Sequence, residues 1–195
     1  MTRLCIVDID GVVADSTARF AKAEEAKQKA IKLLESDPAT WSIAKSKATD
    51  LFWRTAFTPE LVTLDTLIEG TLEAVRNLWS DGWDVFFLTS RPESMRNATI
   101  EWFRVNRFPS FLVDGEKLYM KAPAFQYTKT IVWKAGMIET IAANYEAEEV
   151  LVIDDEQVNI DEIMKYAEKA PYTIRCYKSL KMEDEPEPEK NDNPF

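Results

Sequence analysis

Two pairs of acidic residues, each at the end of an apolar run, constrain this sequence more than any other feature. Asp8 and Asp10 stand at the end of a nearly continuous apolar run, 3–9, and Asp154 and Asp155 close a second apolar run. Side chains alternate along a strand, so Asp8 and Asp10 start on the same side of the chain. Gathered at the carboxyl edge of a parallel sheet, four carboxylates repel one another unless a hard cation such as Mg²⁺ lies between them.

Composition limits the kinds of function that this sequence can have. The chain has 195 residues and 46% hydrophobic residues, which suits one domain with an insertion. No apolar run approaches the roughly 20 residues of a membrane helix, so we expect no membrane partner. Met1 to Arg3 lead straight into the first expected strand, and Cys5 and Cys176 both fall in expected buried strands. We therefore expect no targeting segment, reduced core thiols and a cytoplasmic protein.

Several classes of enzyme are excluded by what the sequence lacks. It contains no histidine, which excludes Ser-His-Asp and Cys-His nucleophiles and histidine-ligated zinc. Neither GxxxxGK[ST] nor GxGxxG occurs, so P-loop kinases and dinucleotide-binding enzymes have no support. The formal net charge of −10 argues against a general nucleic-acid coat. Between residues 91 and 134, however, eight basic residues face four acidic ones, so a local surface for an anionic substrate is still possible.

Apolar runs alternate with helical patterns along the chain, which predicts an α/β fold. The expected strands cover residues 3–9, 83–88, 111–113, 117–120, 150–153 and 172–177, with a hairpin turn at Asp114-Gly115. The expected helices cover residues 18–35, 41–57, 72–79, 92–104, 129–145 and 158–169. This alternation predicts a mostly parallel sheet with helices on both faces, and ligands bind such sheets outside the carboxyl ends of the strands.

The helical stretch 16–65 interrupts the alternation after the first strand. We interpret it as a helical cap inserted over the site, with the core made of residues 1–15 and 66–180. Residues 181–195 are acidic and contain several prolines, which predicts a disordered tail. Four tryptophans are expected to pack in the core or the cap rather than to stack on bases: Trp41, Trp53, Trp102 and Trp133.

Four motifs in order resemble those of the haloacid dehalogenase (HAD) superfamily of phosphohydrolases. Residues 8–15 read DIDGVVAD, similar to the DxDGxxxD opening of that family. A hydrophobic strand that ends in Thr89, a lysine at position 134 and the acidic pair 154–155 resemble its second, third and fourth motifs. The resemblance spans about residues 3–175. It implies a three-layer, Rossmann-like core with a small helical cap.

The resemblance also implies a role for each motif residue. Asp8 is expected to attack phosphorus, and Asp10 to act as general acid and then as general base. Thr89 and Lys134 are expected to bind the transferring phosphoryl group. The expected Mg²⁺ ligands are Asp8, the backbone carbonyl of Asp10, Asp154 and, directly or through water, Asp155. Lys129 is a rival for Lys134, since both stand near the start of one expected helix, and Asp15 could simply cap a helix.

A finer resemblance concerns the substrate. The segment Thr89-Ser90-Arg91, with the helix after it, is similar to the 3′-phosphatase domain of phage-type polynucleotide kinase-phosphatases. It implies that Ser90 and Arg91 contact the substrate, although Arg91 could instead form a salt bridge to a nearby acid. This chain differs by having serine in place of the glycine and by its longer helical insertion.

The leading hypothesis is thus a Mg²⁺-dependent phosphomonoesterase that acts on a nucleotide or a nucleic-acid 3′ end. A phosphatase of small metabolites, such as sugar phosphates or nucleoside monophosphates, is the alternative, favoured by the cap. A phospho-acceptor signalling domain is a remote alternative because the order of its motifs differs. No protein partner is evident.

Overall fold

The computed structural model describes residues 1–34, 41–113 and 116–179. At its centre is a five-stranded parallel sheet in the order β5-β4-β1-β6-β7. Its strands are β1 (Arg3–Val7), β4 (Asp84–Pro92), β5 (Leu118–Lys121), β6 (Glu149–Asp154) and β7 (Thr173–Lys178). The prediction of an α/β fold with a mostly parallel sheet is confirmed.

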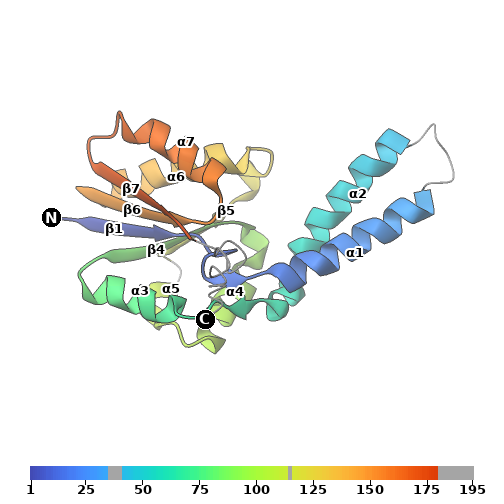
Figure 1. Ribbon diagram of the computed structural model, residues 1–195, viewed down its shortest axis with the longest axis horizontal. Coiled ribbons are helices and arrows are strands. Elements are labelled where there is room, and N and C mark those ends of the chain that lie inside the picture. The colour runs from blue at the N-terminus through green and yellow to red at the C-terminus, as the bar shows by residue number, and fades with distance from the viewer. Residues whose placement is uncertain (35–40, 114–115, 180–195) are drawn as a thin grey trace, which may run out of the picture.

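The sheet is buried on both faces because the middle of each central strand is a continuous apolar run, at residues 4–7, 85–88 and 150–153. Cys5 and Val7 point to one face and Leu4 and Ile6 to the other, in two separate core clusters. The first face is covered by α3 (Thr71–Ser80), α4 (Arg96–Val105) and α5 (Ser110–Val113), and the second by α6 (Thr130–Asn144) and α7 (Gln157–Ala167) (Figure 1). The continuous apolar runs therefore produce a three-layer sandwich.

Strand register brings the acidic pairs to one edge. Val7 pairs with Ile153, and the N–H of Asp8 donates to the Ile153 carbonyl at 2.9 Å. Asp8 follows β1 directly and Asp154 is the last residue of β6, so the two carboxylates leave the sheet side by side. This is the carboxyl edge, where ligands bind in parallel α/β sheets.

Beyond this edge, two long helices extend away from the sheet (Figure 1). They are α1 (Thr17–Leu34) and α2 (Trp41–Ala56), which pack against each other and which we call the arm. A 3₁₀ helix, η2 (Pro59–Leu64), follows them, and a short ladder pairs β2 (Ala14–Asp15) with β3 (Thr66–Leu67) in antiparallel fashion. That ladder places the two ends of the predicted insertion next to each other. The division into core and cap stays a prediction.

Two local predictions are wrong. Residues 111–113 were expected as a strand but lie in α5, where Pro109 accepts the N–H of Leu112 in a first helical turn. Three apolar residues are too short a run to distinguish strand from helix. β5 pairs with β4 in parallel, so no hairpin leads into it, and the predicted turn at 114–115 lies outside the described residues. The predicted tail, 181–195, also lies outside them.

The free cysteines differ in burial. Cys5 is buried in central strand β1, whereas Cys176 is only half-buried because β7 is an edge strand. Burial raises the pKa of Cys5 to about 12 and the pKa of Cys176 to about 11, so neither thiol forms thiolate readily at neutral pH. Within the described ranges, no helix combines the length and apolarity that a membrane span needs.

Candidate active site

Lys134 lies between two carboxylates at the carboxyl edge of the sheet. Its Nζ donates to Asp8 Oδ2 at 2.6 Å and to Asp154 Oδ2 at 2.7 Å, and all three side chains are buried. The other oxygen of Asp8 accepts the N–H of Ile9 at 2.8 Å. Lys134 comes from the second turn of α6, whereas Lys129 is exposed at the N-cap of that helix. The structure thus places Lys134, and not Lys129, against Asp8.

Burial dominates the electrostatics of Asp8. It raises the pKa of the Asp8 carboxyl to about 7, although the Lys134 ammonium opposes that shift. The two carboxylates in turn hold the pKa of Lys134 above its ordinary value, despite the burial of the amine. Asp8 is therefore a carboxyl whose charged form lacks full compensation from the protein alone.

Three carboxylates form a cluster that could hold a cation. One oxygen from each of Asp8, Asp154 and Asp155 lies within 4.8 Å of the others. Asp154 is oriented by Asn159, whose Nδ2 donates to Oδ1 at 2.9 Å, and by the N–H of Glu156 at 2.9 Å. Oxygen donors alone, with a net negative charge, suit Mg²⁺. The incomplete compensation of Asp8 fits the same ion.

Gly11 allows the Asp155 carboxylate to reach this cluster. The backbone of Gly11 has φ +83, a left-handed conformation that glycine adopts without strain. A Cβ added there would lie 2.1 Å from Asp155 Oδ2, so any side chain would displace that carboxylate. The glycine in the DIDG segment therefore serves both the turn and the close approach of Asp155.

Asp10 lies in a second cluster with different chemistry. Arg91 donates from Nε to Asp10 Oδ2 at 3.0 Å and from Nη2 to Oδ1 at 2.7 Å. Arg19 Nη2 also bonds to Oδ1. Both arginines bridge to Asp65, at 2.8 Å from Arg19 Nε and at 2.7 Å from Arg91 Nη2, and both are fully buried. Burial favours the neutral form of Asp10, but Arg91 first and Arg19 second outweigh it and hold its pKa below the ordinary value.

This second cluster joins the core to the arm. Arg19 belongs to α1 and also donates from Nη1 to the carbonyl of Ala56, the last residue of α2, at 2.8 Å. Asp65 follows η2, and its own carbonyl accepts the indole N–H of Trp102 at 2.9 Å. A single network of buried polar groups therefore connects the DIDG segment, both arm helices and α4.

The remaining predicted residues lie at the carboxyl end of β4 and at the start of α1. Thr89 is buried, and its Oγ1 accepts the N–H of Arg91 at 3.2 Å, while Ser90 is half-buried. Arg91 takes the position that we gave as the alternative, a salt bridge to nearby acids, and its Nη1 also donates to Thr99 at 3.3 Å. Asp15 accepts the N–H of Thr17 at 2.9 Å, at the start of α1.

Sequence reasoning missed Arg19, Asp65 and Asn159. Arg19 stands in a helix rich in alanine, lysine and glutamate, whose charged residues are expected on the surface. Asp65 is 46 residues away from Arg19, so no local spacing connects them. Asn159 had a detectable signal, because it lies five residues after Asp154, where the first turn of a helix can return to the strand end.

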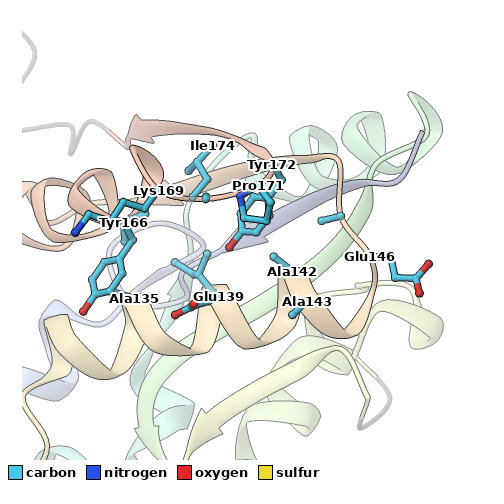
Figure 2. Close-up of a pocket in the computed structure, with 14 residues that line it drawn as sticks. Ala135, Glu139, Ala142, Ala143, Glu146, Tyr166, Lys169, Pro171, Tyr172 and Ile174 are labelled. Carbon is cyan, nitrogen blue, oxygen red and sulfur yellow. The ribbon is translucent and has the colours of Figure 1, made fainter.

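A cavity of about 380 Å³ lies away from these clusters, between α6, α7 and β7 (Figure 2). Its walls are mostly apolar, with Ala142, Pro171 and Ile174 among them, and Glu139 and Lys169 at its margin. None of the clustered aspartates lines it. The candidate site at the strand ends is therefore separate from this cavity.

Comparison with known proteins identifies the fold. No protein-family model matches the sequence, and no curated protein matches it. Solved structures do match. A protein described as a candidate phosphatase from Clostridium difficile has a TM-score of 0.61 and 15% identity, over 92% of this chain and 88% of that one.

Two further solved structures are similar. A HAD-superfamily hydrolase of subfamily IA from Geobacter sulfurreducens has a TM-score of 0.56 and 17% identity, over 92% of this chain and 89% of that one. The class C acid phosphatase from Bacillus anthracis has a TM-score of 0.53 and 13% identity, over 91% of this chain and 66% of that one. The chain thus shares its fold with HAD-superfamily hydrolases and phosphatases.

Proposed function

We propose that the chain is a Mg²⁺-dependent phosphomonoesterase of the HAD type, in which Asp8 forms an aspartyl-phosphate. The observation that carries this proposal is the carboxylate of Asp8, buried at the carboxyl edge of the sheet against Lys134 and Asp154. The fold shared with HAD hydrolases supports the same class of reaction. Asp8, Asp154 and Asp155 would hold the ion. When bound, Mg²⁺ offsets the charge of the carboxylates and of the phosphoryl group.

The reaction has two halves, and Asp10 gives up a proton in the first and regains one in the second. In the first, an oxygen of Asp8 attacks phosphorus, the bond to the leaving oxygen breaks, and that oxygen takes a proton from Asp10. In the second, water attacks the phosphoryl group, gives its proton to Asp10, and the bond between Asp8 and phosphorus breaks. Lys134 and Thr89 bind the equatorial phosphoryl oxygens during both transfers.

The arginine network defines how Asp10 takes part. Arg91 and Arg19 favour its carboxylate, which is the form that accepts a proton from water in the second half. Donation of a proton in the first half requires that Asp10 be protonated against this preference. The leaving group therefore matters, since a good leaving group departs without a proton. Arg19, Arg91 and Asp65 act as positioning residues for Asp10.

For the substrate, we propose a nucleotide or a polynucleotide 3′-phosphate. The excess of basic residues between positions 91 and 134 supports an anionic substrate. Arg91 does not support it, because its guanidinium is occupied by Asp10 and Asp65. A phosphatase of small metabolites is favoured by one feature, the attachment of the arm beside Asp10 through Arg19, because a cap at that place would wall off a long substrate.

The topology of the sheet argues against a phospho-acceptor signalling domain. Numbered along the chain, the five parallel strands have the order 3-2-1-4-5, with the first strand in the centre. Receiver domains of the flavodoxin-like class have the order 2-1-3-4-5. The two folds therefore place their first acidic pair on differently connected strands.

The test is phosphate release from a panel of substrates in Mg²⁺ and in EDTA. The panel contains 3′- and 5′-phosphorylated oligonucleotides, mononucleotides and sugar phosphates. We expect release only in Mg²⁺ and fastest from the 3′-phosphorylated oligonucleotide or a nucleotide. Preference for sugar phosphates would support the metabolite alternative, and no release from any ester would refute the phosphatase.

A second experiment tests the role of Asp10 as general acid. Asp10→Asn should slow the hydrolysis of an alkyl phosphate far more than the first-half burst with p-nitrophenyl phosphate, whose phenolate leaves without a proton. Equal losses of the two rates would contradict the role of Asp10 as general acid.

A further inference from the structure

Four aromatic side chains form a cluster at the base of the arm: Phe20, Phe52, Trp53 and Phe57. The ring of Phe52 lies 6.1 Å from that of Phe20 in a stacked orientation, and the Trp53 and Phe57 rings stack at 5.5 Å. Phe20 comes from α1 and the other three from the end of α2 and the residue after it. The cluster is therefore built by the contact between the two arm helices.

This cluster lies beside Asp10. The guanidinium of Arg19 lies over the Phe20 ring, 4.9 Å from its centroid, and the same guanidinium bonds to the Asp10 carboxylate. Arg19 also bonds to the carbonyl of Ala56, between Trp53 and Phe57 in the sequence. In the proposed reaction the leaving oxygen receives its proton from Asp10. The group attached to that oxygen therefore leaves on the side of the site where the arm begins.

Trp53 is held in place but not covered. Its side chain is 48% exposed, whereas Phe20, Phe52 and Phe57 are half-buried. Phe57 stacks on one side of the indole at an interplanar angle of 19°, and Phe52 meets it edge to face at 85°. Phe20 also meets it edge to face at 6.4 Å, so three neighbours fix the orientation of a ring that still presents surface to a ligand. The expected packing of Trp53 in the cap and its partial exposure therefore occur together.

The charge around the cluster suits an anionic, ring-bearing ligand. The amine of Lys27 lies 5.6 Å from the centroid of the Phe52 ring and pairs with Glu24 at 3.0 Å. The helix α2 carries Lys45, Lys47 and Arg54 against the single acid Asp50, although the whole chain has a net charge of −10. Aromatic rings with adjacent cations bind bases by stacking and phosphates by charge.

We propose that Trp53, oriented by Phe52 and Phe57, stacks on the base of the nucleoside that leaves when its phosphate is transferred to Asp8. The inference rests on the proposed phosphatase and makes its substrate more specific, because a sugar phosphate has no ring to stack. It assigns to the arm the recognition of the leaving group, next to the residue that protonates it.

The test compares two substrates that differ only in the terminal base. One is a dinucleotide with a 3′-phosphate, and the other carries an abasic tetrahydrofuran unit at its 3′-phosphorylated end. Trp53→Ala should lower kcat/KM on the first by about 5- to 150-fold, the worth of one base–aromatic stack, mainly through KM. It should leave kcat/KM on the abasic substrate unchanged. Equal losses on both substrates, or no loss on either, would overturn the proposal.

Two further variants separate stacking from packing. Trp53→Leu keeps an apolar side chain against Phe52 and Phe57, so the arm should stay folded while the stack is lost. If Trp53 serves only the packing of the arm, Trp53→Leu will behave like the wild type on both substrates. Trp79→Ala is the matched control, because Trp79 is 50% exposed at the end of α3, near the start of β4 and opposite the carboxyl edge.

A binding measurement keeps this inference distinct from the proposed reaction. Adenosine 3′-monophosphate should quench tryptophan fluorescence in the wild type and much less in Trp53→Leu, while ribose phosphate should quench neither. Absence of this difference would overturn stacking even in an active phosphatase. If the wild type and Trp53→Leu differ in quenching but the protein releases no phosphate from any ester, the proposed reaction is refuted and the base-binding site stands.

Discussion

Asp8 and Asp10 are separated by one residue, yet the fold gives their carboxylates opposite surroundings. Asp8 has one ammonium, shared with Asp154, and its burial raises its pKa to about 7. Asp10 has two buried guanidinium groups, which lower its pKa. The negative charge of Asp8 is only partly balanced by Lys134, so this carboxylate suits a cation or an electrophile. The charge of Asp10 is already balanced by two arginines. Two acids with separated pKa values can take different roles in one reaction.

The largest expected effect is the loss of catalysis when Asp8 is changed. Asp8→Asn removes the nucleophilic oxygen, and we expect hydrolysis of p-nitrophenyl phosphate in Mg²⁺ to fall by roughly 10⁴-fold or more. The fold should persist, because the amide is isosteric with the carboxylate, and a melting curve followed by circular dichroism checks this. Asp15→Asn is the control, since Asp15 is exposed and bonds to the start of α1. Retained turnover in Asp8→Asn would end the case for the nucleophile.

The arginine cluster should contribute most to stability. Arg91→Ala leaves Asp10 and Asp65 with one cation between them, so we expect a loss of about 3–5 kcal/mol in the free energy of unfolding. Urea denaturation measures that loss. Arg104→Ala, which changes an exposed arginine in α4, should cost well under 1 kcal/mol. A stable Arg91→Ala protein with a raised KM alone would instead support Arg91 as a substrate ligand.

The raised pKa of Asp8 predicts how stability depends on pH in EDTA. Between an unfolded pKa near 4 and the folded value of about 7, the folded protein keeps a proton on Asp8 that the unfolded chain has lost. The free energy of unfolding should therefore fall as pH rises through this window, by up to about 1.4 kcal/mol per pH unit, and level off above it.

The same measurement on Asp8→Asn isolates this group. The variant has no proton to lose at position 8, so the difference between the two proteins should vanish below about pH 4 and grow up to about pH 7. Asp10 contributes in the opposite sense. Its lowered pKa gives stability that is present above its unfolded pKa and is lost on further acidification. A wild-type profile that rises between pH 4 and 7 relative to the variant would contradict the raised pKa.

The sequence could predict the surroundings of Asp8, because they depend on where strands end and how they pair. Apolar runs place Asp8 and Asp154 at strand ends, and parallel pairing then brings the ends together. Lys134 follows from a helix that begins at the same edge. The surroundings of Asp10 depend instead on how the arm returns to the core, since Arg19 and Asp65 meet only when η2 and the β2–β3 ladder have formed. No local periodicity encodes that return.

The short elements show the same limit. Residues 111–113 are apolar, and their helical turn begins with a hydrogen bond from Leu112 to Pro109, which lies outside the apolar run. Trp53 gives no sequence signal that separates it from buried Trp102 or Trp133, because exposure depends on how the arm helices pack. Sequence patterns thus indicate which side chains share a sheet edge more reliably than which ones a tertiary contact leaves uncovered.

The smallest predicted effect concerns the cluster of carboxylates around Asp8 that would hold the ion. Two glycines provide a matched pair of variants. Gly11 and Gly70 have nearly equal backbone angles, φ +83 and φ +79, but only Gly11 has a neighbour that a Cβ would strike, the Asp155 carboxylate. Alanine at either position should cost about 1–2 kcal/mol of stability from the left-handed backbone.

Only Gly11→Ala should also raise the Mg²⁺ concentration needed for half-maximal activity, because it displaces Asp155 from the cluster with Asp8 and Asp154. A Mg²⁺ titration of both variants against the wild type measures this. If Gly11→Ala and Gly70→Ala need the same Mg²⁺ concentration, Asp155 contributes little to binding of the ion. The charge of Asp8 would then be balanced by Lys134 and by an ion that Asp154 and the substrate hold.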